Sequence, residues 1–248
     1  MDLLETSRSR LLRLCDERGA AIDGHLTVRP LSPSDAIGSK APDDFVIKKG
    51  KERVIEAVFQ GAKGQAFTDH PAEWSGSLEE MLSLGLSDVR NRAIFVAGMN
   101  AVLRSLGVAA GTVHCRNEDP VRCGPVLAER VEQKYGIVRV GLIGLQPAML
   151  AALAARFGPD RVRALDLNPD NIGSTKSGVP IWDGSIDLPR LVDWCEVGLA
   201  TGSSIVNGTI DAILGQFRAA GKPVVFFGNT ISGAAALLSL SRVCPFGT

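Results

Sequence analysis

The stretch Glu196-Val-Gly-Leu-Ala-Thr-Gly-Ser-Ser-Ile-Val-Asn-Gly-Thr-Ile-Asp211 decides the fold class of this chain of 248 residues. It reads as a buried strand, Val197 to Ala200, that runs through small hydroxyl residues into a helix from Ser204 to Ala219. Such a turn leaves backbone N–H groups unpaired at the start of the helix. Ser203 or Ser204 can cap the helix, and the remaining donors can face a carboxylate or a phosphate. An isolated turn of this kind is more often only a helix cap, so its neighbours decide between the two interpretations.

Buried strands alternate with helices through the whole second half of the chain, from Gln133 onward. An apolar run at Ile137 to Ile143 is followed by a helical stretch, Pro147 to Phe157, and by a second apolar run, Val162 to Leu167. Another strand candidate, Pro223 to Phe227, follows the helix that ends the quoted stretch. This βαβ order predicts an α/β fold with a Rossmann-like doubly wound parallel sheet, which binds ligands outside the carboxyl ends of its strands.

The first half of the chain has a different order of elements. Leu3 to Arg18 repeats leucines and charges at helical spacing, residues 31–44 are rich in proline and read as an irregular loop, and residues 53–68 read as a β-hairpin. Helices are expected after the hairpin. This order predicts a smaller α+β domain over residues 1–108, followed by the Rossmann-like ligand-binding domain over residues 109–248.

Composition narrows the class of partner. The chain has 27 basic and 27 acidic side chains, so no net field attracts nucleic acid or an anionic membrane surface. No apolar run approaches the roughly 20 residues of a spanning helix, and residues 1–5 lack the features of a signal peptide, so we expect a cytoplasmic protein. The odd number of cysteines, without regular spacing, suits reduced thiols at positions 15, 115, 123, 195 and 244.

Two further turns are expected at the same edge of the parallel sheet. Gly141-Leu-Ile-Gly144-Leu-Gln-Pro147 stands where a dinucleotide fingerprint would, but it lacks the G-x-G-x-x-G spacing and is weak evidence for NAD. Asp166 follows Gly144 by 22 residues, close to the place of a ribose-binding acid, and a plain surface aspartate is an alternative of nearly equal weight. Gly228-Asn229-Thr230 repeats the pattern of a strand followed by small polar residues. The corner at Thr68-Asp69-His70 can close the site from the first half.

One segment concentrates groups that bind transition metals, Gly111-Thr-Val-His114-Cys115-Arg-Asn-Glu118-Asp119-Pro-Val-Arg-Cys123. Its spacing matches no standard structural zinc site, and in a strand His114 and Cys115 would point to opposite faces, so a shared metal requires a loop. The alternative is a buried Cys115 beside a hydrogen-bonded His114. A nucleophile and base pair is a weaker interpretation, because adjacent residues rarely face each other well.

The residues also carry a resemblance to a known family. The stretch from Thr201 to Asp211, together with Gly141-Leu-Ile-Gly144, Asp166-Leu-Asn168 and Asn100-Ala-Val, resembles the bacterial and archaeal proteins described as putative heavy-metal chelation proteins. The resemblance implies an N-terminal domain with an enolase-N-terminal-like fold, a Rossmann-like domain and a cleft between them. It also implies metal chelation, or the handling of a metal-chelating metabolite.

The sequence thus predicts a cytoplasmic protein that binds a transition metal or a metal-chelating small molecule in the interdomain cleft. The sequence does not identify a cofactor; a divalent transition metal is one candidate, with His114, Cys115 and Cys123 as its candidate ligands. A rival interpretation is a transferase-like enzyme that uses a nucleotide or S-adenosylmethionine, and a third is a regulatory or assembly protein that forms a homo-oligomer. The predicted ligand-binding residues are Gly144, Asp166, Thr201, Gly202, Ser203, Ser204, Asn207, Gly228, Asn229 and Thr230.

Overall fold

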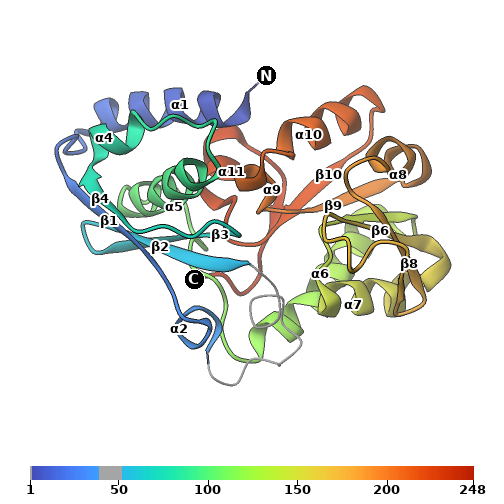
Figure 1. The fold of residues 1–248 in the computed structure, drawn as a ribbon. Helices are drawn as coiled ribbons and strands as arrows, with labels where there is room; N and C mark the ends of the chain where they lie inside the picture. The colour runs from blue at the N-terminus through green and yellow to red at the C-terminus, as the bar shows by residue number, and fades with distance from the viewer. Residues whose placement is uncertain (1, 39–51) are drawn as a thin grey trace.

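The chain contains two β-sheets, one antiparallel and one almost entirely parallel (Figure 1). The structure is a computed structural model that describes residues 2–38 and 52–248. It confirms the predicted α/β class, with a smaller α+β half before a mostly parallel sheet. Part of the irregular loop predicted over residues 31–44 lies outside the described residues. Within the described part, Pro33–Ile37 forms a short helix, α2, because Ser32 caps it and Pro33 suits its first turn.

The antiparallel sheet has the strand order β3-β2-β1-β4. The predicted hairpin is confirmed as β2 and β3, which are joined at Gln60 and Gly61, both with positive φ as a tight hairpin turn requires. The strands of this sheet are β1 (His25–Pro30), β2 (Arg53–Phe59), β3 (Ala62–Thr68) and β4 (Trp74–Ser77).

Three helices accompany this sheet on its apolar face. The predicted first helix is confirmed as α1 (Leu3–Arg18), which begins at the N-cap Asp2 and ends at Gly19 in the left-handed conformation. The other two are α4 (Leu78–Leu82), which has a capping box, and α5 (Val89–Ser105). Most of α5 is buried because it lies between the antiparallel sheet and the C-terminal half (Figure 1).

The larger sheet has the order β11-β10-β9-β5-β6-β8-β7. Every pairing in it is parallel except that of β7 with β8. Numbered along the chain, its six parallel strands lie in the order six, five, four, one, two, three, which is the doubly wound order. The direction in which strands are added to the sheet changes between β5 and β9. The strands are β5 (Val140–Ile143), β6 (Val162–Asp166), β7 (Thr175–Lys176), β8 (Val179–Asp183), β9 (Val197–Thr201), β10 (Val224–Phe227) and β11 (Arg242–Val243).

Helices cover both faces of the parallel sheet, so successive strand residues belong to different apolar clusters. Leu142 packs with residues of the helices on one face, and Ile143 packs with those on the other. The long helix predicted from Ser204 to Ala219 is wrong in one respect, because a left-handed Gly208 divides it into two. The helices are α6 (Asp119–Tyr135), α7 (Pro147–Phe157), α8 (Leu188–Trp194), α9 (Ser204–Asn207), α10 (Ile210–Ala219) and α11 (Ser232–Leu238), with a 3-10 turn, η1, at Pro159–Arg161. Within the described part of the chain, no helix is both long and apolar enough to cross a membrane.

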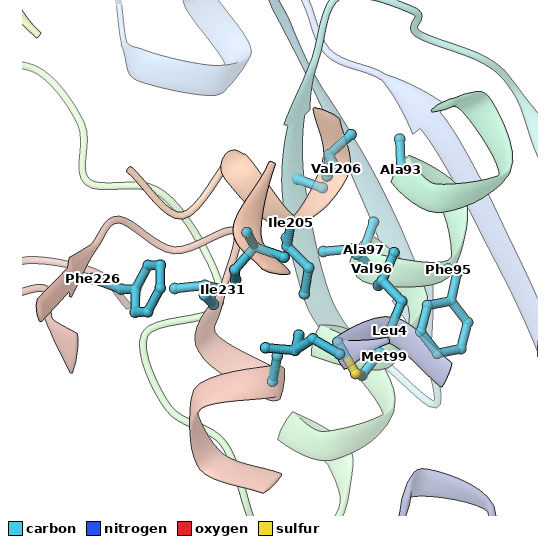
Figure 2. Packing of buried hydrophobic residues seen from close by; sticks show 14 of the residues in the cluster. Leu4, Ala93, Phe95, Val96, Ala97, Met99, Ile205, Val206, Phe226 and Ile231 are labelled. Carbon is cyan, nitrogen blue, oxygen red and sulfur yellow. The ribbon is translucent and has the colours of Figure 1, made fainter. Parts of the chain in front are cut away.

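One apolar cluster contains residues of both halves of the chain. Figure 2 shows Phe95 and Met99 of α5 in the same cluster as Ile205 of α9 and Ile231 beside α11. Leu4 of α1 belongs to it as well. The two sheets are therefore separate, but the apolar interior that supports them is continuous.

Polar contacts also join the halves along this core. The backbone N–H of Leu3 donates to the Asp211 carboxylate at 3.1 Å, so a side chain of α10 binds the first turn of α1. The Arg92 guanidinium of α5 donates to the carbonyl of Val206 at 2.6 Å. These contacts join α1 to α10 and α5 to α9.

Candidate functional site

The topology places the candidate site where the strand order reverses, at the carboxyl ends of β5 and β9. Gly144 follows β5 and Thr201 ends β9, and these strands are neighbours in the sheet. A Cβ on Gly144 would lie 2.5 Å from the Thr201 Cγ2, and Gly144 also has a φ of +89°. Only glycine fits there. The structure therefore brings two of the predicted ligand residues together at the switch point.

The turn after β9 is held by internal contacts. Gly202 is buried, its N–H donates to the Phe227 carbonyl at 2.8 Å, and a Cβ on it would lie 3.0 Å from Ile231. Glycine is required here by the packing of Ile231. The hydroxyls of Thr201 and Ser203 lie 2.9 Å apart, and both side chains are half-buried.

The helix cap expected in this turn is not formed. Ser203 is the N-cap residue of α9, but within the described chain its side chain makes no capping hydrogen bond. The Ser204 hydroxyl is buried and has no hydrogen-bond partner among the described residues. Asn207 lies at the exposed end of α9, and its Oδ1 accepts hydrogen bonds from the N–H and the hydroxyl of Thr209. The helix is only one turn long, so Ser203 has little of a helix to cap.

The turn after β10 faces the antiparallel sheet rather than the solvent. Asn229 and Thr230 are 1% and 2% exposed. The N–H of Phe67 donates to the Thr230 hydroxyl at 3.1 Å, and the Asn229 amide donates to the carbonyl of Gln65 at 3.4 Å. Gly228 has a φ of +94°, and its carbonyl accepts from Arg242. These three predicted residues therefore lie at the junction of the halves.

Asn100 of α5 is the centre of that junction, and the sequence offered no sign of this role. Its side chain is fully buried, and its amide donates to the carbonyls of Gln65 at 3.0 Å and Thr230 at 2.9 Å. Its Oδ1 accepts from the N–H of Gly233 at 2.7 Å. One side chain thus satisfies backbone groups of β3, of the turn after β10 and of α11.

Two carboxylates, one from each half of the chain, lie near enough to Glu52 to affect its ionisation. The β2–β3 register pairs Arg53 with Thr68, which places Glu52 opposite Asp69 at the end of the hairpin. Asp166 ends β6, next to β5. Burial, together with the charges of Asp166 and Asp69, raises the pKa of Glu52 to about 7. Sequence reasoning identified Asp166 and the Asp69 corner, but nothing in the sequence indicated Glu52.

The loop after β6 already holds Asp166. One carboxylate oxygen accepts from the N–H of Asn168 at 2.9 Å, and the other accepts from the Asn171 amide at 2.9 Å. These bonds fix the orientation of the carboxylate and leave its remaining lone pairs free for a ligand.

The raised pKa of Glu52 predicts a pH-dependent loss of stability. Below its usual value of 4.5 this residue is protonated in both states and costs nothing. As the pH rises from 4.5 to about 7, the unfolded chain ionises first, so the free energy of unfolding falls. We expect Glu52→Gln to gain about 1–2 kcal/mol over the parent across this window, a figure reduced for the solvent access of a half-buried side chain, and to keep that gain at higher pH.

Urea unfolding at pH 4, 5.5, 7 and 8 would measure this effect. Glu73→Gln, at an exposed glutamate of the same half, controls for the loss of one negative charge. Parallel stability curves for Glu52→Gln and the parent over this range would show that Glu52 ionises as it does in the unfolded chain.

His114 is a packed, neutral residue in this structure. Its ring makes an edge contact with Phe67 at 5.1 Å, and its Nδ1 lies 2.5 Å from the carbonyl of Cys115. Burial lowers the pKa of His114 to about 4, so the ring is uncharged at neutral pH. This arrangement corresponds to the alternative of a buried, hydrogen-bonded histidine.

The predicted cysteine pair has a third neighbour, Cys244. The backbones of Val113 and Thr248 exchange two hydrogen bonds, at 2.9 and 3.0 Å, which brings the segment after β11 beside this loop. Burial raises the pKa values of Cys115 and Cys123 to about 12, and the Cys244 thiol adds to both shifts. Such thiols are poor nucleophiles at neutral pH.

These donors do not form a metal site of the usual kind. Within residues 2–38 and 52–248, no three histidine, cysteine, aspartate or glutamate side chains are arranged to hold a metal ion. The described side chains therefore do not fit a bare ion held by three protein ligands, either at the carboxylates or at His114, Cys115 and Cys123.

Comparison with known proteins gives a consistent result. The family model described as "Putative heavy-metal chelation" matches residues 129–243. A crystal structure of a protein of unknown function from Pyrococcus horikoshii, assigned to the same family, is 19% identical and has a TM-score of 0.50, with 90% of this chain and 79% of that chain covered. A second structure from this family, from Desulfitobacterium hafniense, is 15% identical and has a TM-score of 0.48, with 83% and 81% covered.

A search of curated proteins found no match. The Pyrococcus structure supports the fold over most of the chain, and it carries no information on the ligand. The resemblance seen in the sequence is confirmed, because the model of the same family matches residues 129–243 of this chain.

Proposed function

We propose that this protein binds a transition metal as the complex of a small chelating molecule, at the carboxyl edge of the parallel sheet where β5 and β9 separate. The observation that carries the proposal is the approach of Glu52 and Asp69 from the N-terminal half to Asp166 of the C-terminal half. Mutual repulsion and burial make Glu52 hard to ionise, and a bound cation would remove that cost. The name of the matched family supports the same class of ligand.

A chelate fits these residues better than a bare ion. The described side chains offer no group of three protein ligands, whereas one or two carboxylate oxygens can complete the coordination of a metal that a small molecule already holds. The Gly144 and Thr201 turns lie at the same edge and provide backbone surface for the organic part. In this proposal the protein supplies carboxylate ligands and shape, and the chelator supplies the remaining donors.

Proton release should accompany binding. Glu52 has a pKa of about 7 and must lose its proton to bind a metal, so the affinity should rise between pH 6 and about pH 8. This direction is opposite to the effect of the same residue on stability. The two pH dependences therefore report on one carboxylate.

Calorimetric titration of the full chain tests the proposal. The probes are Ni²⁺, Zn²⁺, Cu²⁺ and Fe²⁺, each alone and as its citrate complex. We expect Asp69→Asn to weaken binding by about tenfold, which corresponds to 1.4 kcal/mol. Asp193→Asn, at an exposed aspartate of α8, is the matched control. The proposed site is wrong if no probe binds the parent more tightly than about micromolar, or if Asp69→Asn binds as tightly as the parent and the Asp193→Asn control.

The same titration decides the role of the cysteines. Cys115→Ser and Cys123→Ser remove soft ligands with little change of volume. If binding takes place at the carboxylates, both variants should bind as the parent does and differ only in stability. Loss of metal binding in these two variants, with normal binding by Asp69→Asn, would move the site to the cysteines.

The strand order favours one second candidate, an enzyme that binds a nucleotide or S-adenosylmethionine. Gly144 and Asp166 stand at the ends of the first and second parallel strands, where such folds hold the ribose. A thermal shift assay with ATP, NAD and S-adenosylmethionine tests it, because a ligand at about 100 times its Kd adds roughly 2.7 kcal/mol of stability. No shift with these ligands would leave the chelate as the proposal.

We also propose that the protein acts in the cytoplasm. Its five cysteines are free thiols, three of them buried, which suits a reducing compartment.

A further inference from the structure

A polar pocket lies on the face of the antiparallel sheet opposite α5. Its volume is about 200 Å³. The sheet forms its floor, while α2 and the segment after Thr112 form its walls. The lining residues are Arg29, Leu31, Asp35, Ala36, Glu56, Lys63, Gln65, Val113 and Arg116.

The floor is a row of polar side chains across three strands. The register pairs Arg29 of β1 with Glu56 of β2, and Glu56 with Gln65 of β3. Glu56 is only 4% exposed, and one of its oxygens accepts from the Gln65 amide at 2.9 Å. Its other oxygen lies 3.1 Å from the Lys63 ammonium and 4.0 Å from the Arg29 guanidinium. A buried carboxylate thus holds two cations at the pocket.

The pocket carries more positive than negative charge. Arg29, Lys63 and Arg116 stand against Glu56 and Asp35, which leaves one positive charge in excess. Arg116 makes a hydrogen bond at 3.3 Å to a backbone carbonyl of α2 and, among the described residues, forms no ion pair. Both Arg29 and Lys63 remain more than half exposed even though they contact Glu56. All three cations therefore have donors available for a further acceptor.

A purely structural role accounts for only part of this arrangement. One cation would neutralise Glu56, and the Gln65 amide already satisfies its second oxygen. The other cations surround a solvated cavity, where their charges add little to the stability of the fold. The excess is explained if the cavity receives an anion.

We propose that this pocket binds a small oxyanion, the phosphate or carboxylate group of a small molecule, between Arg29, Lys63 and Arg116. Guanidinium groups match the geometry of such anions, and an ammonium adds a point charge. The volume suits a small acid better than a drug-sized ligand, whose pockets usually exceed about 300 Å³. This proposal is independent of the chelate site.

Calorimetric titration of the full chain with sodium phosphate, and separately with sodium acetate, tests the proposal at an ionic strength held constant with sodium chloride. We expect saturable binding of at least one of the two anions, and the arm that binds identifies its source as phosphate or carboxylate. Arg116→Gln should weaken this binding at least tenfold. Arg90→Gln, at an exposed arginine of α5, is the matched control and should bind as the parent does.

A second variant should have the opposite effect on the affinity for the anion. Glu56→Gln keeps an acceptor for the Gln65 amide but removes a negative charge from the pocket floor, so it should bind the anion several-fold more tightly than the parent. Asp69→Asn should leave anion binding unchanged, which separates this result from a test of the chelate site. The proposal is overturned if neither anion binds in a saturable way, if Arg116→Gln and Arg90→Gln behave alike, or if folded Glu56→Gln binds no more tightly.

Discussion

Gly64→Ala is expected to lower the free energy of unfolding by at least about 3 kcal/mol, because there is no room for a methyl group where β3 meets α5. A Cβ on Gly64 would lie 2.2 Å from the backbone nitrogen of Ala101 and 2.4 Å from the carbonyl oxygen of Ala97. Both atoms belong to the helix backbone, which cannot rotate away as a side chain could. The helix would have to move off the sheet, and the shared core would open with it.

Urea unfolding followed by circular dichroism would measure this loss. Gly215→Ala is the matched control, since Gly215 is exposed within α10 and no described heavy atom lies within 4 Å of a Cβ there. It should gain about 0.5–1 kcal/mol, because alanine is the better helix former. If both variants shift stability by similar amounts, close packing at Gly64 is not what requires glycine.

Asn100→Ala is expected to cost about 3–5 kcal/mol, since it leaves several buried backbone groups without partners at once. The carbonyl of Thr230 loses its donor, the carbonyl of Gln65 keeps only the 3.4 Å bond from the Asn229 amide, and the N–H of Gly233 loses its acceptor. Each such group costs about 1–3 kcal/mol when it is buried and unpaired. Loss of packing adds little, because the side chain is small.

Asn91→Ala is the matched control on the same helix. Asn91 is half-buried near the start of α5, and its amide donates to the carbonyl of Gly85 at 3.0 Å. It should cost less than about 1.5 kcal/mol, the upper end for one ordinary hydrogen bond. Equal costs for the two variants, by the same urea measurement, would mean that water replaces the Asn100 contacts.

The parallel sheet could be predicted from the sequence because its strands are buried on both faces. Ile137 to Ile143 and Val162 to Leu167 are mostly apolar runs, and β5 and β6 lie within them. The hairpin was equally clear, since its short turn stands between two β-type runs. Periodicity of this kind depends on local burial, which the residues themselves report.

The division of the helix after β9 could not be predicted in the same way. A single glycine inside a helical pattern is tolerated in many helices, so Gly208 gave no sufficient reason to end one. The tertiary contact of Arg92 with the carbonyl of Val206 accompanies the break. That contact joins residues 114 positions apart, a separation over which local patterns carry no information.

The residues of the candidate site that follow parallel strands could be predicted from the sequence. The residues that join it from other parts of the chain could not. Gly144 and Thr201 follow apolar strands, so the topology alone places them together. Glu52 depends on how the hairpin is oriented against Asp166, and Cys244 depends on the backbone pairing of Val113 with Thr248. Such contacts follow from packing between elements that are distant in the sequence.

The continuous core limits how far this protein is modular. The family model matches residues 129–243, but Ile205 and Ile231 within this segment complete their packing against Phe95 and Met99 of α5 (Figure 2). If that segment were expressed alone, it would expose this apolar surface to water, and apolar patches of that kind promote aggregation. The N-terminal half therefore covers apolar surface that residues 129–243 would otherwise expose. A substitution on either side of the shared cluster should therefore change how the other side packs.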